Sequence, residues 1–379
     1  MSQPSLDVVV IGGGIVGTAA AAFLVEAGAS VTLIEQEGLA SGASGANSGV
    51  VQHPFDPVLA VLYEETLALY RELSAADLGF RLGDEPAGLM YVSPDEAAPR
   101  HVARLLAEAF PQLPHDVVTG PALERLEPAL APGLWACRVE MGFPVFPGAS
   151  TYAYASRAER GGAHVRLGRT ATLERRGDEV RGVLLDGRAI GCDAVLVAAG
   201  PWTPAVIDPN GRWAPIHRTW GVVVEVELPS GPTHVLEGAE IGTAIGQQAL
   251  NGEAHADADH VDFSLMPLPG IATVGSTFLL REPEHGEWVE PILSRATTFV
   301  PSVAEAPIRG SRACARPQSV DGRPLIGPVP GLRGLYVCAG HGPWGISTGP
   351  ASARLVVDEI LGRSPAIPAE LDAARSGGP

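Results

Sequence analysis

The sequence contains few cysteines, fewer basic than acidic residues, and no long hydrophobic run. The cysteines stand far apart and form no C-x-x-C pair, which argues against a disulfide framework and against a zinc or other metal site (Cys137, Cys192, Cys314 and Cys338). With 26 basic and 43 acidic residues the formal net charge is −17, so nucleic acids and anionic membranes would be repelled. No apolar run reaches the roughly 18 residues that a membrane-spanning helix needs.

Hydrophobic residues are nevertheless plentiful. They make up 46% of the 379 residues, which is ample for a large core and predicts two domains. A first predicted strand begins within about six residues of the N-terminus, which leaves no room for the charged and apolar regions of a signal peptide. We therefore expect a soluble globular protein in a reducing cytoplasm.

The segment Asp7–Gln36 has the pattern of a strand, a tight turn, a helix and a second strand. Within it, Gly12, Gly14 and Gly17 fit the spacing G-x-G-x-x-G. In a dinucleotide-binding unit the first glycine permits the turn, the second lets a pyrophosphate approach the backbone, and the third lets helix and strand pack closely. The pyrophosphate lies at the helix N-terminus, where unpaired N–H groups and the helix dipole favour negative charge.

An acidic residue ends the second strand of this unit. Glu35 stands eighteen residues after Gly17 and directly follows the apolar run Ser30–Ile34. A carboxylate at this position accepts hydrogen bonds from ribose hydroxyl groups and disfavours a 2′-phosphate, which argues against NADP. A lone glycine motif is a weak signal, but together with the strand, the helix and the acid it predicts a bound dinucleotide.

The rest of the chain indicates an α/β fold in which both ends of the chain build one domain. A β-meander after residue 169 returns to a buried parallel strand at Ala194–Ala198, and Leu335–Cys338 is a last apolar strand before a helix over Pro350–Leu361. Alternating patterns between Arg218 and Leu280 predict an antiparallel sheet in a second domain of α+β type.

This organisation predicts a discontinuous Rossmann-like nucleotide-binding domain and an antiparallel-sheet substrate domain. The nucleotide domain is expected over residues 1–80, 148–208 and 311–365, and the substrate domain over residues 81–147 and 209–310. Residues 366–379 are expected to form a flexible tail. Smaller features expected within these segments are a helix over Val58–Leu73, strands and loops from Arg81 to Pro147, a helix, glycine stop and strand in TYAYASRAERGGAHV, and a turn over Gly340–Gly345.

Three stretches resemble a known family from one end of the chain to the other. They are VVVIGGGIVGTAAAAFLVEAGASVTLIEQ, DAVLVAAGPWT, and the C-terminal pair RPQSVDGRPLIGP and YVCAGHGPWGISTGPASARLVVDEILG. The sequence resembles the amino-acid-oxidising flavoproteins that include D-amino-acid oxidase, glycine oxidase, D-amino-acid dehydrogenase and sarcosine oxidase. The resemblance implies a tightly bound FAD that lies extended across the sheet, with its isoalloxazine ring at the domain boundary.

The resemblance also implies which residues contact the FAD. In ASGASGANSG, small residues allow backbone N–H contacts beside the pyrophosphate and the ring, and hydroxyl groups donate to anionic oxygens. In GHGPWGISTG, glycines precede a helix whose N-terminus can stabilise the negative charge that the flavin pyrimidine edge gains on reduction. The expected FAD contacts are Gly12, Gly14, Ile15, Val16, Gly17, Glu35, Gln36, Ser44, Gly45, Ala46, Asn47, Ser48, Val165, Ala199, Gly200, Trp202, Gly340, His341, Gly342, Gly345, Ile346 and Ser347.

The family reaction removes a hydride from the carbon that bears the amine, delivers it to flavin N5, and leaves an imine that water hydrolyses. Since the cofactor performs the chemistry, the protein must orient the substrate and hold its carboxylate. Arg316, in CARPQSVDG, matches the arginine with which glycine-oxidase-type members grip the substrate carboxylate bidentately. His341 is a candidate for a hydrogen bond near the ring, and Asp321-Gly322 is expected to form a turn.

Two positions bear on how the flavin is held and reoxidised. Cys314 stands seven residues before Asp321, the spacing at which monomeric sarcosine oxidase carries its flavin-linking cysteine. Glycine-oxidase-type members, which have an arginine at the position of Arg316, do not carry a covalent bond between cysteine and flavin. Arg316 therefore favours non-covalent FAD. Thr273 falls where sarcosine oxidase carries the lysine that promotes its reaction with oxygen. This weakens an oxidase assignment and leaves oxygen and a quinone or dye as alternative acceptors.

The leading prediction is an FAD-dependent oxidoreductase that acts on a small amino acid or an N-substituted glycine. Two alternatives stay open at this point: oxidation of an opine, hydroxyproline or a 2-hydroxy acid, and a flavin-binding subunit or redox sensor without turnover. Phe263 and Met266 are candidates for the pocket lining, with core packing as the simpler interpretation, and Trp344 is a candidate for covering the active site. The sequence leaves the substrate side chain and the oligomeric state open.

Overall fold

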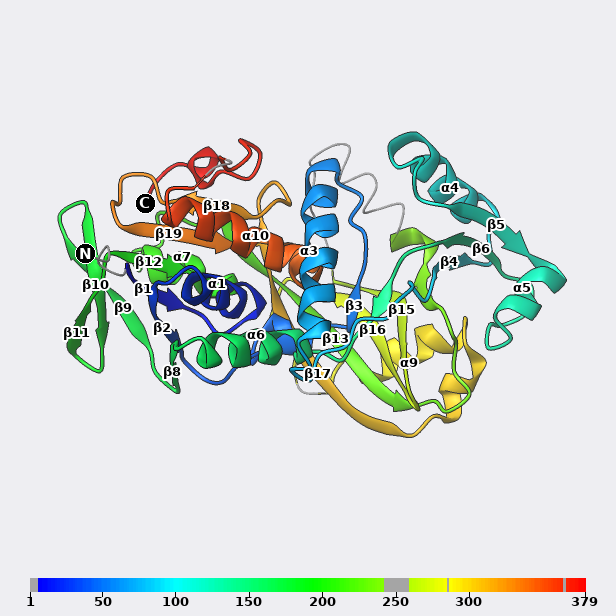
Figure 1. Cartoon of the computed structure of the whole chain (residues 1–379). Coiled ribbons are helices and arrows are strands. Elements are labelled where there is room, and N and C mark those ends of the chain that lie inside the picture. Colours follow the sequence, from blue (N-terminus) through cyan, green and yellow to red (C-terminus); the bar gives the residue numbers. More distant parts are fainter. Residues whose placement is uncertain (1–5, 242–258, 285, 364–365) are drawn as a thin grey trace.

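The structure is a computed structural model, which describes residues 6–241, 259–284, 286–363 and 366–379 of the chain. Two lobes lie side by side, each built around its own large sheet, and helix α3 stands between them (Figure 1). Elements from the start, the middle and the end of the chain meet in the first lobe (Figure 1). None of the described helices is long and apolar enough to cross a membrane.

The first lobe contains a six-stranded sheet in the order β18-β19-β12-β1-β2-β8. Its strands are β1 (Asp7–Ile11), β2 (Ser30–Glu35), β8 (His164–Leu167), β12 (Ala194–Val197), β18 (Leu325–Pro328) and β19 (Leu335–Ala339). The central strand β1 pairs parallel with both β2 and β12, whereas the edge strand β18 runs antiparallel to β19. The inner strands are apolar along their length because both faces of the sheet are covered. This arrangement confirms the predicted Rossmann-like topology.

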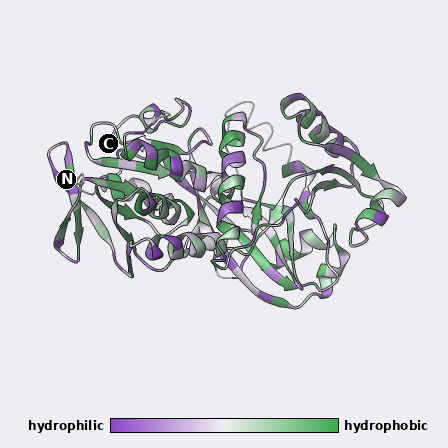
Figure 2. Ribbon diagram, viewed as in Figure 1, coloured by the Kyte–Doolittle hydropathy of each residue, from purple (hydrophilic) through white to green (hydrophobic). Residues whose placement is uncertain are grey.

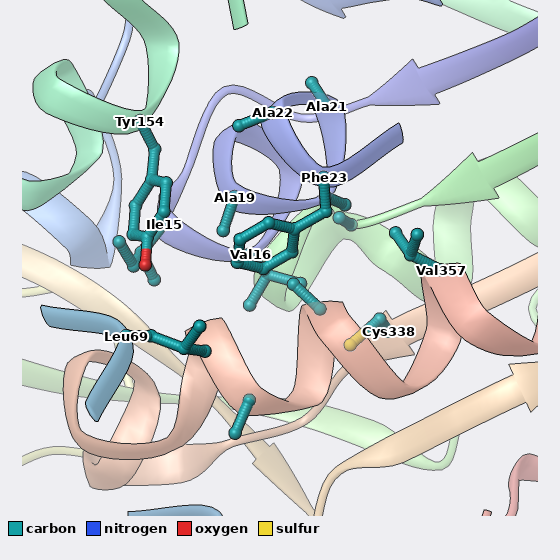
Figure 3. Packing of buried hydrophobic residues seen from close by; sticks show 14 of the residues in the cluster. Ile15, Val16, Ala19, Ala21, Ala22, Phe23, Leu69, Tyr154, Cys338 and Val357 are labelled. Atoms are coloured by element: carbon teal, nitrogen blue, oxygen red, sulfur yellow. The ribbon is translucent and has the colours of Figure 1, made fainter. Parts of the chain in front are cut away.

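Helices α1 (Ile15–Glu26), α6 (Ala149–Arg160) and α10 (Gly345–Ile360) cover one face of this sheet. Helix α1 is buried along most of its length because Ala19–Ala22 are small enough for α6 and α10 to approach closely. In Figure 3, Phe23 of α1 lies above α10, whose Val357 belongs to the same core. Tyr154 of α6 meets Phe23 edge-on, with ring centroids 5.6 Å apart.

A three-stranded antiparallel sheet covers the opposite face. It consists of β9 (Ala171–Arg176), β10 (Glu179–Leu185) and β11 (Arg188–Gly191), and the short helix α7 (Thr203–Ile207) packs beside it. Its buried residues Val180 and Val183 share a core with Val9, Val195 and Val197 of the large sheet. The β-meander predicted between residue 169 and the parallel strand at Ala194–Ala198 is thereby confirmed.

The second lobe is built on an eight-stranded sheet in the order β17-β13-β16-β15-β14-β4-β6-β5. Its strands are β4 (Leu89–Ser93), β5 (His115–Thr119), β6 (Trp135–Val139), β13 (Ile216–Glu227), β14 (Val235–Gly238), β15 (His260–Leu268), β16 (Ile271–Phe278) and β17 (Ile308–Ser319). All neighbouring pairs are antiparallel except β14 with β4, which is parallel. The predicted antiparallel sheet is confirmed, with one parallel junction where the two inserted segments meet.

In the described parts of the chain, helices α4 (Ala97–Ala109), α5 (Gly120–Leu126) and α9 (Val289–Thr297) pack on the second lobe. Helices α4 and α5 lie between Arg81 and Pro147, where the sequence pattern predicted strands and loops. Helix α4 buries Pro99, Val102 and Leu106 on one face and exposes the other, so its apolar residues are too few to stand out among the neighbouring prolines and glycines.

Helix α3 (Pro57–Ala75) separates the lobes and includes the predicted helical segment. Asp56 caps it, since its Oδ1 accepts hydrogen bonds from the N–H groups of Val58 and Leu59 at 2.7 and 3.1 Å, and Pro57 occupies the first helical position. Its buried residues recur every three or four positions, which gives the alternating hydrophilic and hydrophobic bands along α3 in Figure 2.

Helix α10 begins at Gly345, five residues before the predicted start at Pro350. A proline inside a helix lacks the N–H group that would bond to the carbonyl four residues earlier, here that of Ile346. The Tyr70 hydroxyl group donates to this carbonyl at 2.7 Å and replaces the missing partner. A tertiary contact from α3 thus stabilises a helical turn that local sequence rules assign to a loop.

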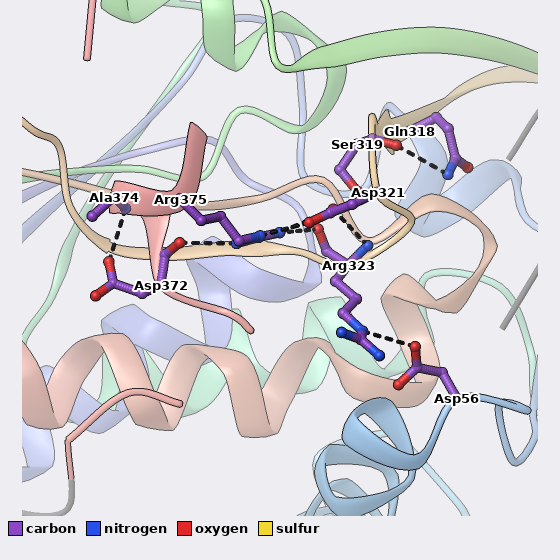
Figure 4. Close-up of polar contacts among 8 residues, drawn as sticks. All are labelled: Asp56, Gln318, Ser319, Asp321, Arg323, Asp372, Ala374 and Arg375. Carbon is purple, nitrogen blue, oxygen red and sulfur yellow. Dashed lines mark hydrogen bonds and ion pairs between the residues drawn. The ribbon is translucent and has the colours of Figure 1, made fainter. Parts of the chain in front are cut away.

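The C-terminal segment packs on the first lobe and differs from the flexible tail expected for residues 366–379. Leu371 and Ala373 are buried, and Arg375 in the short helix η4 (Ala373–Ser376) donates to both carboxylate oxygens of Asp321, at 2.7 and 3.1 Å (Figure 4). Asp321 also lies in the turn expected at Asp321-Gly322. Composition alone does not reveal these contacts, because the anchoring residues are separated by polar and small residues.

Candidate active site

A cavity of about 310 Å³ is lined from both lobes. The turns that follow β1, β2, β12 and β19 contribute from the first lobe, and strands β13 to β17 contribute from the second. Most of the residues predicted to bind the cofactor or substrate lie on its wall: Gly12, Gly14, Ile15, Val16, Glu35, Gln36, Ser44, Ala46, Asn47, Ser48, Ala199, Gly200, Trp202, Arg316, His341, Gly342, Gly345, Ile346 and Ser347. Segments far apart in the sequence therefore converge on one site.

Glu35 supports the glycine turn after β1. Its Oε2 accepts a hydrogen bond from the Gly13 N–H group at 2.6 Å, and its Oε1 accepts one from the Glu37 N–H group at 2.9 Å. The side chain is largely buried and lines the cavity. Each carboxylate oxygen can accept two hydrogen bonds, so one acceptor position on each oxygen is left for ribose hydroxyl groups.

The N-terminus of α1 has no acidic residue in its first turn and no capping side chain at Gly14. Ser44, from the short helix α2 (Ala43–Ala46), accepts a hydrogen bond from the Ile15 N–H group at 2.9 Å. A Cβ atom added at Gly14 would lie 3.0 Å from the Ser44 Oγ atom, so glycine keeps this space open. The helix dipole, the first-turn N–H groups and the open space suit a pyrophosphate.

The turn between β19 and α10 contributes a buried imidazole. Gly340 and Gly342 adopt positive φ angles of 94° and 54°, a conformation that favours glycine. Between them, His341 is buried, and its Nε2 atom has no hydrogen-bond partner in the described parts of the chain. Burial lowers the pKa of His341 to about 4, so the imidazole is neutral at pH 7. Such a nitrogen suits a hydrogen bond to a bound ligand and cannot supply a positive charge.

Arg316 brings a cation to the cavity from strand β17. Its Nη1 donates to the Thr277 carbonyl at 2.9 Å, its Nη2 donates to the Ser276 Oγ atom at 3.1 Å, and its guanidinium lies 4.4 Å from the centroid of the Phe278 ring. Within the described residues it forms no ion pair, whereas nearby Arg312 pairs with Glu225 at 3.0 Å. Burial lowers the pKa of the Arg316 guanidinium, as expected for a cation without a counter-charge. Arg316 is therefore available to an anionic ligand.

Comparison with known proteins identifies the family to which these features belong. Residues 7–359 match the family described as FAD dependent oxidoreductase. The chain belongs to this family. The family resemblance inferred from the sequence is thereby confirmed, and FAD is the cofactor of the family. The open space at Gly14, the free acceptor positions on Glu35 and the unpartnered nitrogen of His341 fit this dinucleotide.

Relatives of this FAD-dependent oxidoreductase cover nearly its whole length. A glycine oxidase from Pseudomonas aeruginosa is 29% identical over 384 residues, which cover 95% of this chain and 96% of the relative. The crystal structure of a glycine oxidase from Bacillus cereus superimposes with a TM-score of 0.80 at 25% identity and covers 95% of this chain and 96% of its own. An L-proline dehydrogenase from P. horikoshii shares the fold, with a TM-score of 0.81 at 21% identity and coverage of 98% and 97% of the two chains.

Cys314 lies on the cavity wall of the oxidoreductase. Its Sγ atom is 3.8 Å from the Ala46 carbonyl oxygen, next to the loop predicted to lie beside the flavin. Burial raises the pKa of the Cys314 thiol, and the neighbouring guanidinium groups of Arg316 and Arg312 oppose this effect only in part. A protonated thiol is a poor nucleophile. The cysteine is therefore well placed, but not activated, for covalent attachment.

Thr273 is buried and is not among the residues that line the cavity. Its hydroxyl group accepts a hydrogen bond from Arg312 Nη2 at 3.2 Å, and the same nitrogen donates to the Asn47 carbonyl at 3.2 Å. The whole sequence contains no lysine, since each of its 26 basic residues is an arginine. This family member therefore lacks any lysine that could promote a reaction with oxygen, and Thr273 is instead hydrogen-bonded to Arg312, which pairs with Glu225.

Four predicted cofactor contacts lie off the cavity wall. At Gly17 an added Cβ atom would come within 2.0 Å of the Gly12 carbonyl oxygen, and at Gly45 within 2.2 Å of the Ala40 carbonyl oxygen, so these glycines serve close packing. Val165 pairs with Leu33 in the sheet, and Gly340 packs beside Ser319 and Ile216. Among the candidates for the pocket lining, Met266 and Trp344 line the cavity, whereas Phe263 stacks on Phe299 in the core.

Sequence reasoning missed several residues that line the cavity beside Arg316. Ser276 and Phe278 orient its guanidinium, and Gln52 and Glu237 face the cavity from the segment after β3 (Val50–Val51) and from β14. One feature of the sequence could have indicated Glu237: it is a single acidic residue within the apolar segment HVLEG. A charge in a strand that is otherwise buried requires a partner or a function.

Proposed function

We propose that the protein oxidises a small amino acid or an N-substituted glycine by hydride transfer from the amine-bearing carbon. The observation that carries this proposal is Arg316, a half-buried guanidinium on the cavity wall that forms no ion pair with any described residue. A planar fork of N–H groups fits a carboxylate bidentately. The glycine oxidase relatives support an amino-acid substrate, since they match over nearly the full chain.

The bound FAD would supply the hydride acceptor, and the residues around it would position the substrate. Ser276 and the Thr277 carbonyl fix the orientation of the Arg316 guanidinium, and the Phe278 ring supports its flat face. The carboxylate is thereby held in one plane, which restricts where the neighbouring carbon can lie. The neutral imidazole of His341 adds a hydrogen-bonding group without adding charge.

We further propose that the FAD is bound without a covalent link and is reoxidised faster by a quinone or dye than by oxygen. The protonated thiol of Cys314 supports the first statement. The second statement is supported by the absence of lysine from the sequence and by the pairing of Arg312, the hydrogen-bond partner of Thr273, with Glu225. Peroxide release in air at the rate of substrate consumption would contradict the second statement.

Anaerobic reduction of the bound flavin tests the proposed function. Glycine, sarcosine, D-alanine and L-proline are mixed in turn with the purified protein, and loss of the yellow absorption is followed. We expect bleaching by at least one of these amines and none by glycolate or 2-hydroxyglutarate. Bleaching by hydroxy acids alone would assign a different reaction, and no bleaching by any compound would indicate a flavin-binding protein without turnover.

A further inference from the structure

Glu237 is a buried carboxyl group on the cavity wall with an incomplete set of hydrogen bonds. It is only 5% exposed. Its Oε1 accepts a hydrogen bond from Gln52 Nε2 at 3.2 Å, whereas its Oε2 has no hydrogen-bond partner in the described parts of the chain. A buried carboxyl oxygen without a donor is costly, so a donor from a ligand would complete the site. We propose that Glu237 binds the amino group of the substrate and accepts a proton from it.

The sheet register places Glu237 within reach of a ligand held by Arg316. Glu237 pairs with Ser264 on β15, and Ser264 pairs with Gly275 on β16. The next residue, Ser276, holds the Arg316 guanidinium, and Glu237, Ser276 and Arg316 all line the same cavity. Two strand spacings separate the backbones of Glu237 and Gly275, which corresponds to about 10 Å. A small amino acid with a hydrogen bond at each end spans about 8 to 9 Å, so its carboxylate can lie on Arg316 while its amino group points to Glu237.

The surroundings of Glu237 suit a proton acceptor near neutral pH. Burial is the main cause that raises the pKa of Glu237 to about 7, and the charge of Asp262 on β15 adds to it. Gln52 and the hydroxyl group of Tyr91 on β4 oppose the shift, although the Tyr91 hydroxyl lies outside hydrogen-bond geometry. A group with a pKa close to the working pH is ionised often enough to take up a proton and basic enough to hold it.

The proposed step is a proton transfer from the substrate ammonium nitrogen to Glu237 Oε2. The nitrogen keeps the electron pair of the broken N–H bond, and the carboxylate becomes a neutral carboxylic acid, so no net charge is added to the buried site. The neutral amine can then release a hydride from its adjacent carbon, because the nitrogen lone pair stabilises the cation that forms. The substrate class is therefore an amino acid that carries both a carboxylate and an amine that binds in its protonated form. This inference rests on the proposed function.

The decisive variant is Glu237→Gln in the FAD-loaded protein. The amide keeps the size of the side chain but cannot accept a proton. With glycine, sarcosine, D-alanine or L-proline, the wild-type rate of anaerobic flavin reduction should rise through about pH 7 as Glu237 ionises. In Glu237→Gln this rise should disappear, and the rate at pH 8 should fall by roughly 100-fold, within the usual contribution of a general base. Glu237→Asp should restore part of the rate, with flavin content and thermal midpoint as checks on folding.

A matched control is Glu127→Gln, which changes another buried glutamate of the second lobe. Glu127 lies off the cavity wall, and its Oε2 already accepts hydrogen bonds from Thr233 and His234. This variant should lose thermal stability and keep the pH profile of the wild type. If Glu237→Gln instead reduces as fast as the wild type with the same profile, the assignment of Glu237 is wrong even though the proposed function holds.

A binding measurement separates the two proposals. Binding of the same amines, and of acetate and propionate as amine-free carboxylates, is followed by perturbation of the flavin spectrum. Glu237→Gln should weaken amine binding by roughly 10-fold or more and leave acetate binding unchanged or tighter, since a negative charge is removed. If no amine bleaches the wild type but amine binding still depends on Glu237, the proposed oxidation fails and the amine site stands. Equal effects on amines and acetate would contradict the amine site.

Discussion

Replacement of Arg316 by alanine should remove substrate binding while leaving the fold and the cofactor in place. The guanidinium has five N–H groups and donates to the Thr277 carbonyl and the Ser276 hydroxyl group, so three N–H groups are left for a carboxylate. We expect kcat/KM for the amine substrate to fall in Arg316→Ala. Arg316→Lys should recover only part of the loss, because an ammonium group cannot reproduce the two parallel hydrogen bonds.

The size of the loss follows from these contacts. Each hydrogen bond to a charged group contributes about 1.5 to 3 kcal/mol, and water that enters the truncated site recovers part of the total. A net loss of about 2 to 4 kcal/mol corresponds to a decrease in kcat/KM of roughly 30- to 1000-fold. The free energy of unfolding should change by no more than about 1 kcal/mol, because two lost hydrogen bonds are offset by removal of a half-buried cation that has no ion-pair partner among the described residues.

The assay compares flavin reduction, flavin content and thermal midpoint in Arg316→Ala and in a matched control, Arg295→Ala. Arg295 also lies over a phenylalanine, 4.9 Å from the centroid of the Phe299 ring, but it pairs with Glu240 and lies off the cavity wall. The control should keep full activity. If Arg316→Ala keeps full activity on a carboxylate-bearing amine, another residue holds that group. If it loses flavin or unfolds, the arginine has a structural role.

Three further predictions concern the cofactor and the pH dependence of stability. In Gly14→Val, the new side chain would fill the space beside Ser44 Oγ, so the purified protein should contain no FAD and be colourless. The control is Gly38→Ala, which should keep its FAD content because no atom lies within 4 Å of a Cβ added there. Denaturing electrophoresis should separate flavin fluorescence from the chain, and fluorescence that survives in the band and disappears in Cys314→Ser would show a covalent link instead. Burial lowers the pKa of His53 to about 4, below the unfolded value of about 6.5, so acidification from pH 6.5 to 4 favours the unfolded state by up to about 3 kcal/mol. His53→Phe should flatten this dependence in urea titrations, and an unchanged slope would contradict a buried neutral imidazole.

Much of the first lobe was predictable because its signals are local. Strand, glycine turn, helix and acid follow one another within Asp7–Gln36, and each has a physical reason to stand at its spacing. The start of α10 was not predictable, since Tyr70, far away in the sequence, supplies the hydrogen bond that Pro350 cannot. The packed C-terminal segment escaped prediction for the same reason, because its anchor to Asp321 is a tertiary contact.

The residues of the candidate site also fall into those that short motifs predict and those that only the folded chain brings together. Arg316 and the glycine turns are recognisable in short motifs, and the structure places them on one cavity. Glu237 and Gln52 belong to no motif, and their proximity arises from the packing of β14 against the segment after β3. The environment of a residue, including its desolvation, is a property of the folded chain. A sequence can therefore show an unusual buried acid but not the group that completes its hydrogen bonds.

The strand order of the six-stranded sheet also constrains how the protein folds during synthesis. Strand β1 finds β2 soon after both leave the ribosome, but its other neighbour, β12, lies 186 residues further along the chain, as in the pair Val8 and Ala194. Such distant contacts form slowly, and the apolar edge of β1 stays exposed until they do. Ser347 is translated after every other residue on the cavity wall. The complete cavity can therefore form only after Ser347 has been synthesised, so a cofactor bound in it would be a late ligand of folding instead of its nucleus.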